Sequence, residues 1–496
     1  MRLSELIRGM APEPPQDAEV TGISYDSRKV VPGGLYVALI GSKADGHSFV
    51  PQAVAAGAVA VVYSREIELP DGVAGAKVED TRAALSKIAD RFYGHPSGRL
   101  RVIGITGTKG KTSTAYLVEH ILLRNGIKCG LMGSLEHKTG SRRISAVNTT
   151  PESLDVARYM AEMAEAGCKA CVMEASSHAL QLGRVEDVCF DVGVLTNMGH
   201  DHMDFHLTYE GYLMAKARLF SMLARECQCG IADLKGRKAA VINMDDEYAD
   251  YMQRRSRDAG ARSIGYGLGE SSFLRAVDIV REIGRTTFTA ATMDGDSARV
   301  ETRLAGVFSV YNCLAAMGAA LAMGISLKDS AEAIASFAGV AGRFERVEAG
   351  QDFNVIVDFA HNPESLQSAL QTAREMTDGR LTVVFGCCGN RDRTNRPWMA
   401  RIAQELADSV IVTHDNPLDE EPSQIISDIK VGLTLATPYE IEPDRGIAIR
   451  KAVGAARRGD TVLIAGKGAE TYQKTGQLAI HFDDREEAAL AIKERI

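Results

Sequence analysis

The segment 104–114, GITGTKGKTST, restricts the possible folds of this chain more than any other stretch does. The short strand-like run 101–103 precedes it and a periodic apolar stretch begins at Ala115, so the sequence predicts a strand, a glycine turn and a helix start. Gly107 and Gly110 let the backbone approach an anion closely, and the free N–H groups at a helix start face that anion. This order of elements is typical of a loop that holds a phosphate.

Two side chains after the second glycine extend the predicted phosphate site. Lys111 is placed to reach the outer phosphates of a nucleotide, and Thr112 is placed to bind Mg²⁺. The pattern departs from the common G-x-x-x-x-G-K-T, because Ile105 stands where the first glycine is usual. A glycine turn that binds nothing is the alternative, and the lysine and threonine together disfavour it. The sequence therefore predicts nucleotide binding and leaves the reaction open.

The length of 496 residues predicts about three domains, because one core serves about 150 residues. We place them at residues 1–98, 99–340 and 341–496. In the third block, apolar strand-like runs alternate with amphipathic helices, which predicts a parallel sheet covered on both faces. Polar motifs follow these runs, at the sheet edge where such folds bind ligands. The third block is therefore predicted to be a binding platform.

Composition excludes several classes of function. The formal net charge is -8, so no broad basic surface for a nucleic acid is expected. The N-terminal ten residues lack the apolar core of a signal peptide, and the longest apolar stretch, 313–327, is shorter than the ~20 residues of a spanning helix. We expect no membrane partner, a cytoplasmic protein, and a packed helix over 313–327.

The nine cysteines are irregularly spaced and odd in number, which fits a reducing compartment better than a disulfide framework. Cys168 and Cys171 form a C-x-x-C pair without a second pair at zinc-ribbon spacing. Buried thiols are therefore favoured over a metal site.

Acidic and imidazole groups follow two further apolar runs, in VMEASSH (172–178) and LTNMGHDHMDFH (195–206). Glu174 offers a hard oxygen ligand that suits Mg²⁺, and His202 is a candidate for a second metal position. A hydrogen-bonded loop is the alternative for the histidines. No guanine-reading Asn-Lys-x-Asp motif is present, so a switch GTPase is disfavoured.

Lys216 lies on a predicted apolar helix face, where Tyr212, Leu213, Leu219 and Phe220 recur at helical spacing. An unpaired ammonium costs several kcal/mol to bury, so this lysine should lose its proton, find a carboxylate or be modified. A neutral amine can add carbon dioxide to become an anionic carbamate. A lysine that extends its ammonium to solvent is the simpler alternative, and the residues alone favour it.

Ten ordered motifs resemble those of the Mur ligase family: TGTKGKTS, NTTPES, MEASSH, TNMGHDHMDFH, YLMAK, GRFERV, VDFAHNP, GNRDR, DNP and AGKGAE. The resemblance covers nearly the whole chain, including YDSRKVVPGGLYVAL in the first block. It implies an α/β protein of three domains: a UDP-binding N-terminal domain, a central P-loop ATPase with a mostly parallel sheet, and a Rossmann-like C-terminal domain for an amino acid. A monomer is also expected.

The resemblance implies a reaction as well. ATP would phosphorylate the D-Glu γ-carboxylate of UDP-MurNAc-L-Ala-D-Glu, and the amino group of a diamino acid would attack the acyl phosphate. Metal ions and Lys111 would offset the phosphate charge during this transfer. This amide ligation belongs to peptidoglycan precursor synthesis.

Carried over by matching motifs, the resemblance implies five groups of site residues. Catalysis is implied for Lys111, Lys216 as a carbamylated lysine, His202 and Glu174, and metal binding for Thr112, Glu174, His202 and Lys216. ATP binding is implied for Gly107, Thr108, Lys109, Gly110, Lys111, Thr112, Asn312, Arg343 and Asp358. Binding of the UDP-MurNAc-dipeptide is implied for Ser27, Asn148, Thr149, Thr150, Ser176 and Arg184, and binding of the amino acid for Arg391, Asp415, Asn416, Gly466 and Glu470. Lys109, Leu182, Ser309 and Ala469 depart from residues frequent at the matching positions.

The stretch HDNPLDEEP, 414–422, is expected to select the amino acid. Family members that add meso-diaminopimelate typically read Asp-Asn-Pro-Arg there, and the guanidinium can clamp the distal carboxylate. Leu418 replaces that arginine, which would remove a contact worth roughly 1.5 to 3 kcal/mol. The sequence therefore predicts L-lysine, with meso-diaminopimelate as the alternative. The acidic run 419–421 is more typical of a solvated surface than of an ammonium site.

Two other functions stay open from the sequence. A folylpolyglutamate synthetase-like amide ligase is the nearest, although that group lacks the N-terminal UDP-binding block. A nucleotide-dependent binding module without chemistry is the second.

Overall fold

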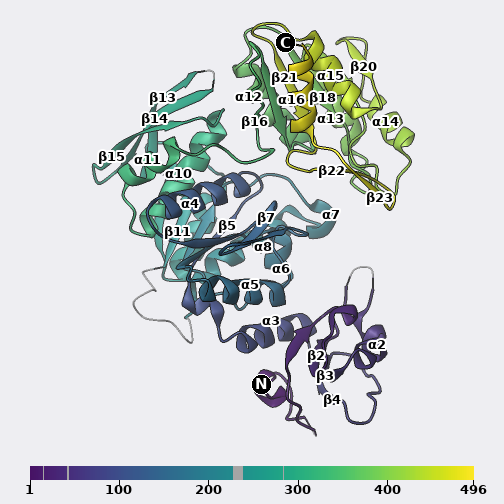
Figure 1. The fold of residues 1–496 in the computed structure, drawn as a ribbon. Helices are drawn as coiled ribbons and strands as arrows, with labels where there is room; N and C mark the ends of the chain where they lie inside the picture. Colours follow the sequence, from purple (N-terminus) through teal and green to yellow (C-terminus); the bar gives the residue numbers. More distant parts are fainter. Residues whose placement is uncertain (15, 42–43, 227–237, 283, 496) are drawn as a thin grey trace. The chain divides into compact units, whose positions relative to one another are not determined.

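The computed structural model describes residues 1–14, 16–41, 44–226, 238–282 and 284–495 (Figure 1). The chain divides into two compact units. The first comprises Met1–Val277, Thr289–Arg299 and Tyr311–Ile334, and the second comprises Asp278–Phe288, Val300–Val310 and Ala335–Ile496. The boundaries predicted at 98 and 340 stay a prediction.

The N-terminal part of the first unit contains a small parallel sheet. Its strands, in spatial order, are β1 (Gly22–Ser24), β2 (Gly34–Val37), β3 (Ala58–Tyr63) and β4 (Ala74–Lys77). Its helices include α1 (Leu3–Leu6), α2 (Val50–Ala55) and α3 (Thr81–Phe92). The Asp80 carboxylate caps α3 by accepting from the N–H groups of Arg82 and Ala83, which fixes where this helix begins. The strand-like runs GLYVAL (34–39) and AVAVVY (58–63) contain β2 and β3.

The next sheet carries the phosphate loop. Within the described residues its eleven strands run in the order β15-β14-β13-β12-β11-β10-β5-β9-β6-β7-β8, and the strands from β13 to β6 pair in parallel. The strands are β5 (Arg101–Thr106), β6 (Cys129–Met132), β7 (Glu136–Thr139), β8 (Arg142–Ser145), β9 (Ala170–Glu174), β10 (Val192–Leu195), β11 (Ala239–Asn243), β12 (Arg262–Gly267), β13 (Leu274–Glu282), β14 (Arg285–Thr292) and β15 (Ser297–Thr302). The helices are α4 (Lys111–Arg124), α5 (Ser153–Glu165), α6 (Ser177–Gln181), α7 (Met203–His206), α8 (Tyr209–Ser221), α9 (Ala249–Asp258), α10 (Val307–Ala322) and α11 (Leu327–Ala335).

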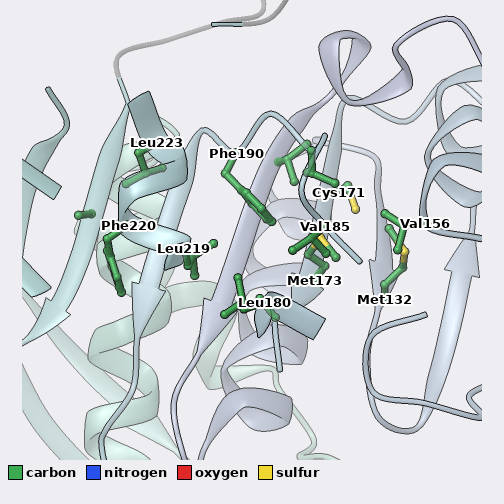
Figure 2. Packing of buried hydrophobic residues seen from close by; sticks show 14 of the residues in the cluster. Met132, Val156, Cys171, Met173, Leu180, Val185, Phe190, Leu219, Phe220 and Leu223 are labelled. Atoms are coloured by element: carbon green, nitrogen blue, oxygen red, sulfur yellow. The ribbon is translucent and has the colours of Figure 1, made fainter. Parts of the chain in front are cut away.

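An apolar cluster packs helices α5, α6 and α8 onto this sheet. Figure 2 shows part of it, including Phe190, Leu219 and Phe220. A Cβ atom at Gly104 in β5 would lie 2.6 Å from the Phe190 ring and 2.8 Å from the Leu219 side chain. The first glycine of the phosphate-loop segment is therefore required by core packing, and the cluster holds the end of β5 in place.

The helix predicted over 313–327 is only partly right. Helix α10 contains Cys313 but ends at Ala322, and α11 begins at Leu327. Gly324 has a φ of 85°, which closes α10 in the manner usual for glycine. None of the helices in the described ranges is long and apolar enough to cross a membrane. The seven described cysteines are free, and Cys168 and Cys171 are buried thiols as predicted.

The second unit contains a parallel sheet with one antiparallel edge strand. Its order is β16-β17-β21-β18-β19-β20, from β16 (Glu345–Arg346), β17 (Asn354–Asp358), β18 (Leu381–Phe385), β19 (Ser409–Val412), β20 (Tyr439–Ile441) and β21 (Thr461–Ala465). Its helices are α12 (Pro363–Glu375), α13 (Asn395–Leu406), α14 (Pro422–Lys430), α15 (Arg445–Ala455) and α16 (Asp484–Arg495), and β22 (Tyr472–Thr475) pairs with β23 (Leu478–His481) as a hairpin. The predicted α/β class and its alternating pattern are confirmed. The polar motifs that follow β17, β18, β19 and β21 lie at the carboxyl ends of these parallel strands.

Candidate active site

The phosphate loop joins β5 to α4 as the sequence predicts. Gly107 has a φ of 147°, and a Cβ atom there would lie 1.9 Å from the Thr196 hydroxyl oxygen. Gly110 has a φ of 80°, and a Cβ atom there would lie 2.4 Å from the side-chain oxygen of Asn312. Both positions require glycine, since an L side chain would be strained and would clash. Asn312, a predicted ATP contact, thus borders the loop.

Backbone carbonyls of the loop hold the Lys111 side chain. Its ammonium donates to the Gly107 and Thr108 oxygens at 2.8 and 2.9 Å. The backbone N–H of Lys109 donates to Asn197 Oδ1 at 2.9 Å, which ties the loop to the segment after β10. The loop is therefore ordered by its own contacts, and the Lys111 charge lies at the turn where a phosphate is predicted.

Glu174 is fully buried at the end of β9. Its carboxylate accepts from the Thr112 hydroxyl at 3.0 Å, and from the backbone N–H and hydroxyl of Ser134 at 2.8 and 3.0 Å. These donors are neutral, and no cation among the described residues forms an ion pair with Glu174. A buried carboxylate without a countercharge is costly, so the site is suited to a bound cation.

The Thr112 and Glu174 oxygens fit Mg²⁺, which takes one or two carboxylates and completes its shell with phosphate oxygens and water. In the described ranges of the chain, no three His, Cys, Asp or Glu side chains are grouped so that they could hold a metal ion. A metal ion at Glu174 would therefore depend on nucleotide phosphates for further ligands.

Lys216 lies on the inward face of α8, as its spacing predicts, with 1% of its surface exposed. Its Nζ donates to the Gly107 carbonyl at 2.7 Å and lies 4.5 Å from the centre of the Tyr212 ring. Burial lowers the pKa of Lys216 far below its usual range, and the nearby Lys111 charge lowers it further. The side chain therefore does not extend to solvent, and its surroundings beside the phosphate loop favour the neutral amine.

Histidine rings gather next to this amine. The His202 ring lies 4.6 Å from His178, which stacks on Phe205 at 4.1 Å. Burial, followed by the charges of His202 and His206, lowers the pKa of His178 to about 4. Sequence reasoning missed His178, and its only signal was that it ends the motif that contains Glu174. The predicted metal role of His202 stays a prediction.

Three predicted contacts of the nucleotide-linked dipeptide form one hydrogen-bonded group. The Thr150 hydroxyl donates to the Glu174 carbonyl at 2.6 Å and lies 3.2 Å from the Ser176 hydroxyl. Arg184 donates to the Thr150 carbonyl at 3.1 Å. The group lies on the strand end that also carries the Glu174 carboxylate.

The other predicted dipeptide and UDP contacts are more dispersed. Asn148 is exposed, and the Thr149 hydroxyl accepts from the Ser134 hydroxyl at 3.1 Å. Ser27 is buried in the N-terminal part of the unit, where its hydroxyl donates to Gln52 Oε1 at 2.9 Å. Their roles in binding stay predictions.

Arg343 and Asp358, predicted at the ATP ribose and base, lie together in the second unit. The Arg343 guanidinium lies 4.6 Å from the centre of the Phe359 ring, and the Asp358 carboxylate accepts from the Phe344 N–H at 2.7 Å. Burial raises the pKa of Asp358, and the charge of Arg343 opposes this shift. The Arg343 charge therefore acts on the Asp358 carboxylate, and its guanidinium lies against an aromatic ring.

Four predicted amino-acid contacts meet at the ends of β19 and β21. Asn416 donates to Glu470 Oε2 at 2.7 Å, and a Cβ atom at Gly466 would lie 2.4 Å from Asp415 Oδ2. Lys467 is fully buried, and its ammonium lies 3.2 Å from Asn416 Oδ1 and 3.3 Å from Glu470 Oε2. Sequence reasoning missed Lys467, although it stands in the same AGKGAE motif.

Arg391 belongs to the same cluster through Cys388. Burial, followed by the charges of Asp415 and Glu470, raises the pKa of the Cys388 thiol to about 11, and Arg391 opposes this shift. The thiol is therefore close enough to Asp415, Glu470 and Arg391 for their charges to act on it. The cluster can bind ammonium and carboxylate groups side by side, which is the chemistry of an amino-acid site.

Three family models match the chain in order. The Mur ligase family, catalytic domain, matches residues 19–93; the Mur ligase middle domain matches 105–320; and the Mur ligase, glutamate ligase domain, matches 342–468. A UDP-N-acetylmuramoyl-L-alanyl-D-glutamate--2,6-diaminopimelate ligase of Geobacillus thermodenitrificans is 45% identical over 478 residues, which cover 96% of each chain. The chain belongs to the Mur ligase family. The resemblance seen in the sequence is confirmed.

Two further relatives of this Mur ligase carry the same name. The 2,6-diaminopimelate ligase of Bacillus cereus is 42% identical over 484 residues, covering 97% of this chain and 96% of the relative. A solved structure with that name superposes with a TM-score of 0.68 at 31% identity, and covers 96% of this chain and 95% of its own. These names do not support the lysine specificity predicted from Leu418.

The acidic run 419–421 of this Mur ligase is only partly the solvated surface that the sequence favours, because Asp419 and Glu421 are exposed whereas Glu420 is half-buried. Glu420 accepts from Arg396 at 2.9 and 3.1 Å and from the Asn390 N–H at 2.6 Å, and Arg396 is 1% exposed. The Arg396 hydrogen bonds lower the pKa of Glu420 to about 2. Through Glu420, the stretch 414–422, the specificity loop, is therefore bound to the loop that carries Arg391.

A buried ion pair fixes the two strand ends beneath the amino-acid cluster. Arg445 binds Asp484 through two contacts of 2.7 Å, and it donates to the carbonyls of Ala465 at 3.0 Å and His414 at 3.3 Å. These carbonyls immediately precede Gly466 and Asp415. Arg445 therefore fixes the backbone that positions the amino-acid cluster of this Mur ligase.

Proposed function

We propose that this Mur ligase adds 2,6-diaminopimelate to the D-Glu γ-carboxylate of UDP-N-acetylmuramoyl-L-alanyl-D-glutamate, with ATP as the activating substrate. The observation that carries this proposal is the similarity over 96% of both chains to relatives named for that reaction. The ordered phosphate loop with Lys111 supports the use of ATP. Meso-diaminopimelate was the alternative to lysine from the sequence, and it now becomes the favoured amino acid.

In the central site, four side chains share three tasks. Lys111 and the N–H groups of α4 bind the transferred phosphate. Thr112 and Glu174 would hold Mg²⁺, which would neutralise phosphate charge during the transfer. The amine of Lys216 adds carbon dioxide and releases a proton, and the resulting carbamate would offer an anionic ligand to a metal ion. The γ-carboxylate of the substrate attacks the outer phosphorus of ATP and displaces ADP, which gives an acyl phosphate, so no covalent enzyme intermediate is needed.

In the second unit, the amino-acid cluster binds the incoming nucleophile. Arg391 pairs with its α-carboxylate, and Asp415 and Glu470 accept hydrogen bonds from its amino groups. The attacking amine loses a proton as the amide bond forms, and inorganic phosphate leaves. The protein acts as a monomer in this proposal.

Turnover with different amino acids tests the proposal. The purified protein, UDP-MurNAc-L-Ala-D-Glu and Mg-ATP are supplied with meso-diaminopimelate, L-lysine or L-ornithine, and phosphate release and tripeptide product are measured together. We expect kcat/KM for meso-diaminopimelate to exceed that for L-lysine by at least about tenfold. A higher value for lysine would overturn the choice of amino acid.

The folylpolyglutamate synthetase-like function is the runner-up from the sequence. Residues 19–93, which that group was expected to lack, match a Mur ligase family model. Phosphate release that requires a folate, with none from UDP-MurNAc-L-Ala-D-Glu, would favour the runner-up. ATP binding with no amide product would favour a binding module.

The contacts of Glu420 lead to a separate prediction. We expect Glu420→Gln to raise KM for the amino acid about tenfold, or about 1.4 kcal/mol, because the Asn390 loop that positions Arg391 loses its anchor. Asp428→Asn is the matched control, since Asp428 also binds Arg396, at 2.8 Å, and is not hydrogen-bonded to Asn390. Steady-state kinetics with thermal melting should show lower stability in both variants and a raised KM in the first alone. Equal KM values in both would contradict the positioning role.

A further inference from the structure

The specificity loop lacks a charge where the proposed substrate needs one. 2,6-Diaminopimelate carries a second carboxylate that lysine does not have, and Leu418 cannot pair with it. An unpaired carboxylate in a protein site is disfavoured, so another cation must lie within reach if the proposed function holds. The backbone around Leu418 indicates where that cation is.

Leu418 pairs with β22. Its N–H donates to the Lys474 carbonyl at 3.1 Å, and its own carbonyl accepts from the Gly476 N–H at 2.6 Å. Leu418 and Thr475 form a parallel β-bridge. Leu418 also has a φ of 55°, a backbone conformation that is rare for a branched side chain and costs about 1 to 2 kcal/mol. The loop is thus held in an unusual shape against the hairpin, with Lys474 as a direct neighbour.

Strand β22, which carries Lys474, lies beside the amino-acid cluster, because the Gln473 amide in this strand donates to the Asp415 carbonyl at 2.9 Å. Side chains alternate along a strand, so Tyr472 and Lys474 share a face. The Tyr472 ring lies 5.4 Å from the Lys467 ammonium. Burial raises the pKa of Tyr472, and Glu470, Cys388 and Asp415 raise it further, which places the phenol within their fields.

The other cations of the cluster already have partners. Lys467 binds Asn416, Glu470 and the Tyr472 carbonyl, and the guanidiniums of Arg393 and Arg396 bind Glu420. Arg391 is assigned to the α-carboxylate. Among the described residues, no carboxylate forms an ion pair with Lys474, and its side chain is half-buried.

We propose that Lys474 binds the distal carboxylate of the incoming diamino acid, and that it supplies from β22 the positive charge absent at position 418. This inference rests on the proposed function. The flexible four-carbon stem of lysine and its three ammonium donors suit a carboxylate held at a variable angle. Lys474 is a specificity-determining residue in this account, because L-lysine offers it no carboxylate and its charge repels an ε-ammonium.

The test compares two substrates across four variants. We expect Lys474→Met to lower kcat/KM for meso-diaminopimelate by about 10- to 100-fold, mainly through KM, and to leave L-lysine turnover unchanged or improved. Lys474→Arg should keep the preference for meso-diaminopimelate. The double variant Leu418→Arg/Lys474→Met should recover the preference for meso-diaminopimelate, because the arginine at position 418 supplies a positive charge from the segment that pairs with β22. Lys493→Met, a change of an exposed lysine in α16, is the matched control and should alter neither substrate.

Two outcomes would overturn the inference. One is an unchanged selectivity in Lys474→Met. The other is an equal loss for both amino acids, which would mean a structural role; thermal melting of each variant identifies a folding defect. Failure of the proposed function is seen separately, in the unmodified protein, as a preference for L-lysine over meso-diaminopimelate.

Discussion

Lys216→Ala is expected to lower kcat by about 1,000-fold, the loss typical when one preorganised charge-stabilising group is removed from an active site. The side chain is 1% exposed, it donates to the Gly107 carbonyl at 2.7 Å, and burial lowers its pKa, which favours the uncharged, nucleophilic amine. A carbamate on this amine would place a negative oxygen next to the phosphate loop. Truncation to alanine removes that oxygen and leaves Gly107 with its contact to Lys111.

Chemical rescue separates a carbamate from a merely structural lysine. Bicarbonate or a short carboxylic acid should partly restore Lys216→Ala, because the space left by the side chain can admit a free anion. Lys216→Arg is the matched control: it keeps a donor for the Gly107 carbonyl but cannot form the carbamate, so it should be inactive and resist rescue. With isotope-labelled bicarbonate, the unmodified protein should show a carbamate signal in NMR that both variants lack. An active Lys216→Arg enzyme would show that the group acts as a donor only.

Local patterns in the sequence were sufficient for the parts of this site that lie within one element. The strand, glycine turn and helix at 101–124 follow from neighbouring residues, and the inward face of α8 follows from helical spacing. Both kinds of signal report local geometry. The position of Lys216 on the inward face was predictable for this reason, although the residues alone favoured an ammonium that reaches solvent. Its contact with Gly107, 109 residues away, was not predictable.

Local patterns could not predict contacts between loops that are distant in the sequence. Glu420 reads as part of a charge run, and only the fold reveals that Arg396 is buried beneath it. Likewise, the sequence shows at Leu418 only that an arginine is absent. The structure pairs Leu418 with the hairpin strand that carries Lys474, and pairing between segments 56 residues apart leaves no local periodicity. The names of the relatives do not support the substrate preference inferred from this one position, since the charge of a binding site depends on every segment that lines it.

The end of α10 was missed for a different reason. Ala- and Gly-rich sequence continues from 313 to 325 without a polar residue, so hydrophobic periodicity shows no boundary at Ala322. The structure ends the helix at Ala322 through Gly324 in the left-handed region. A single glycine in an apolar run is compatible with either a continuous or a closed helix, and packing decides between them.

Glu174→Gln is the second change expected to be severe, with a loss of about 100-fold or more in turnover at ordinary Mg²⁺ concentrations. The amide has nearly the same shape as the carboxylate, and two of its three hydrogen-bond donors are hydroxyls, from Thr112 and Ser134, that can rotate to suit it. The fold should therefore survive, and its thermal stability should be equal or higher, because a buried negative charge without a countercharge is removed. The lost function is the attraction of a divalent cation.

Magnesium titration distinguishes this explanation from a packing defect. In the unmodified protein, Mg-ATP should raise the melting temperature more than ATP alone, and in Glu174→Gln that difference should shrink to near zero. Thr149→Val is the matched control, because Thr149 accepts from the same Ser134 hydroxyl without contacting Glu174 in the described contacts. It should keep the magnesium-dependent shift. If Glu174→Gln keeps that shift and its activity as well, the buried carboxylate is a structural hydrogen-bond acceptor and the cation binds elsewhere along the phosphate loop.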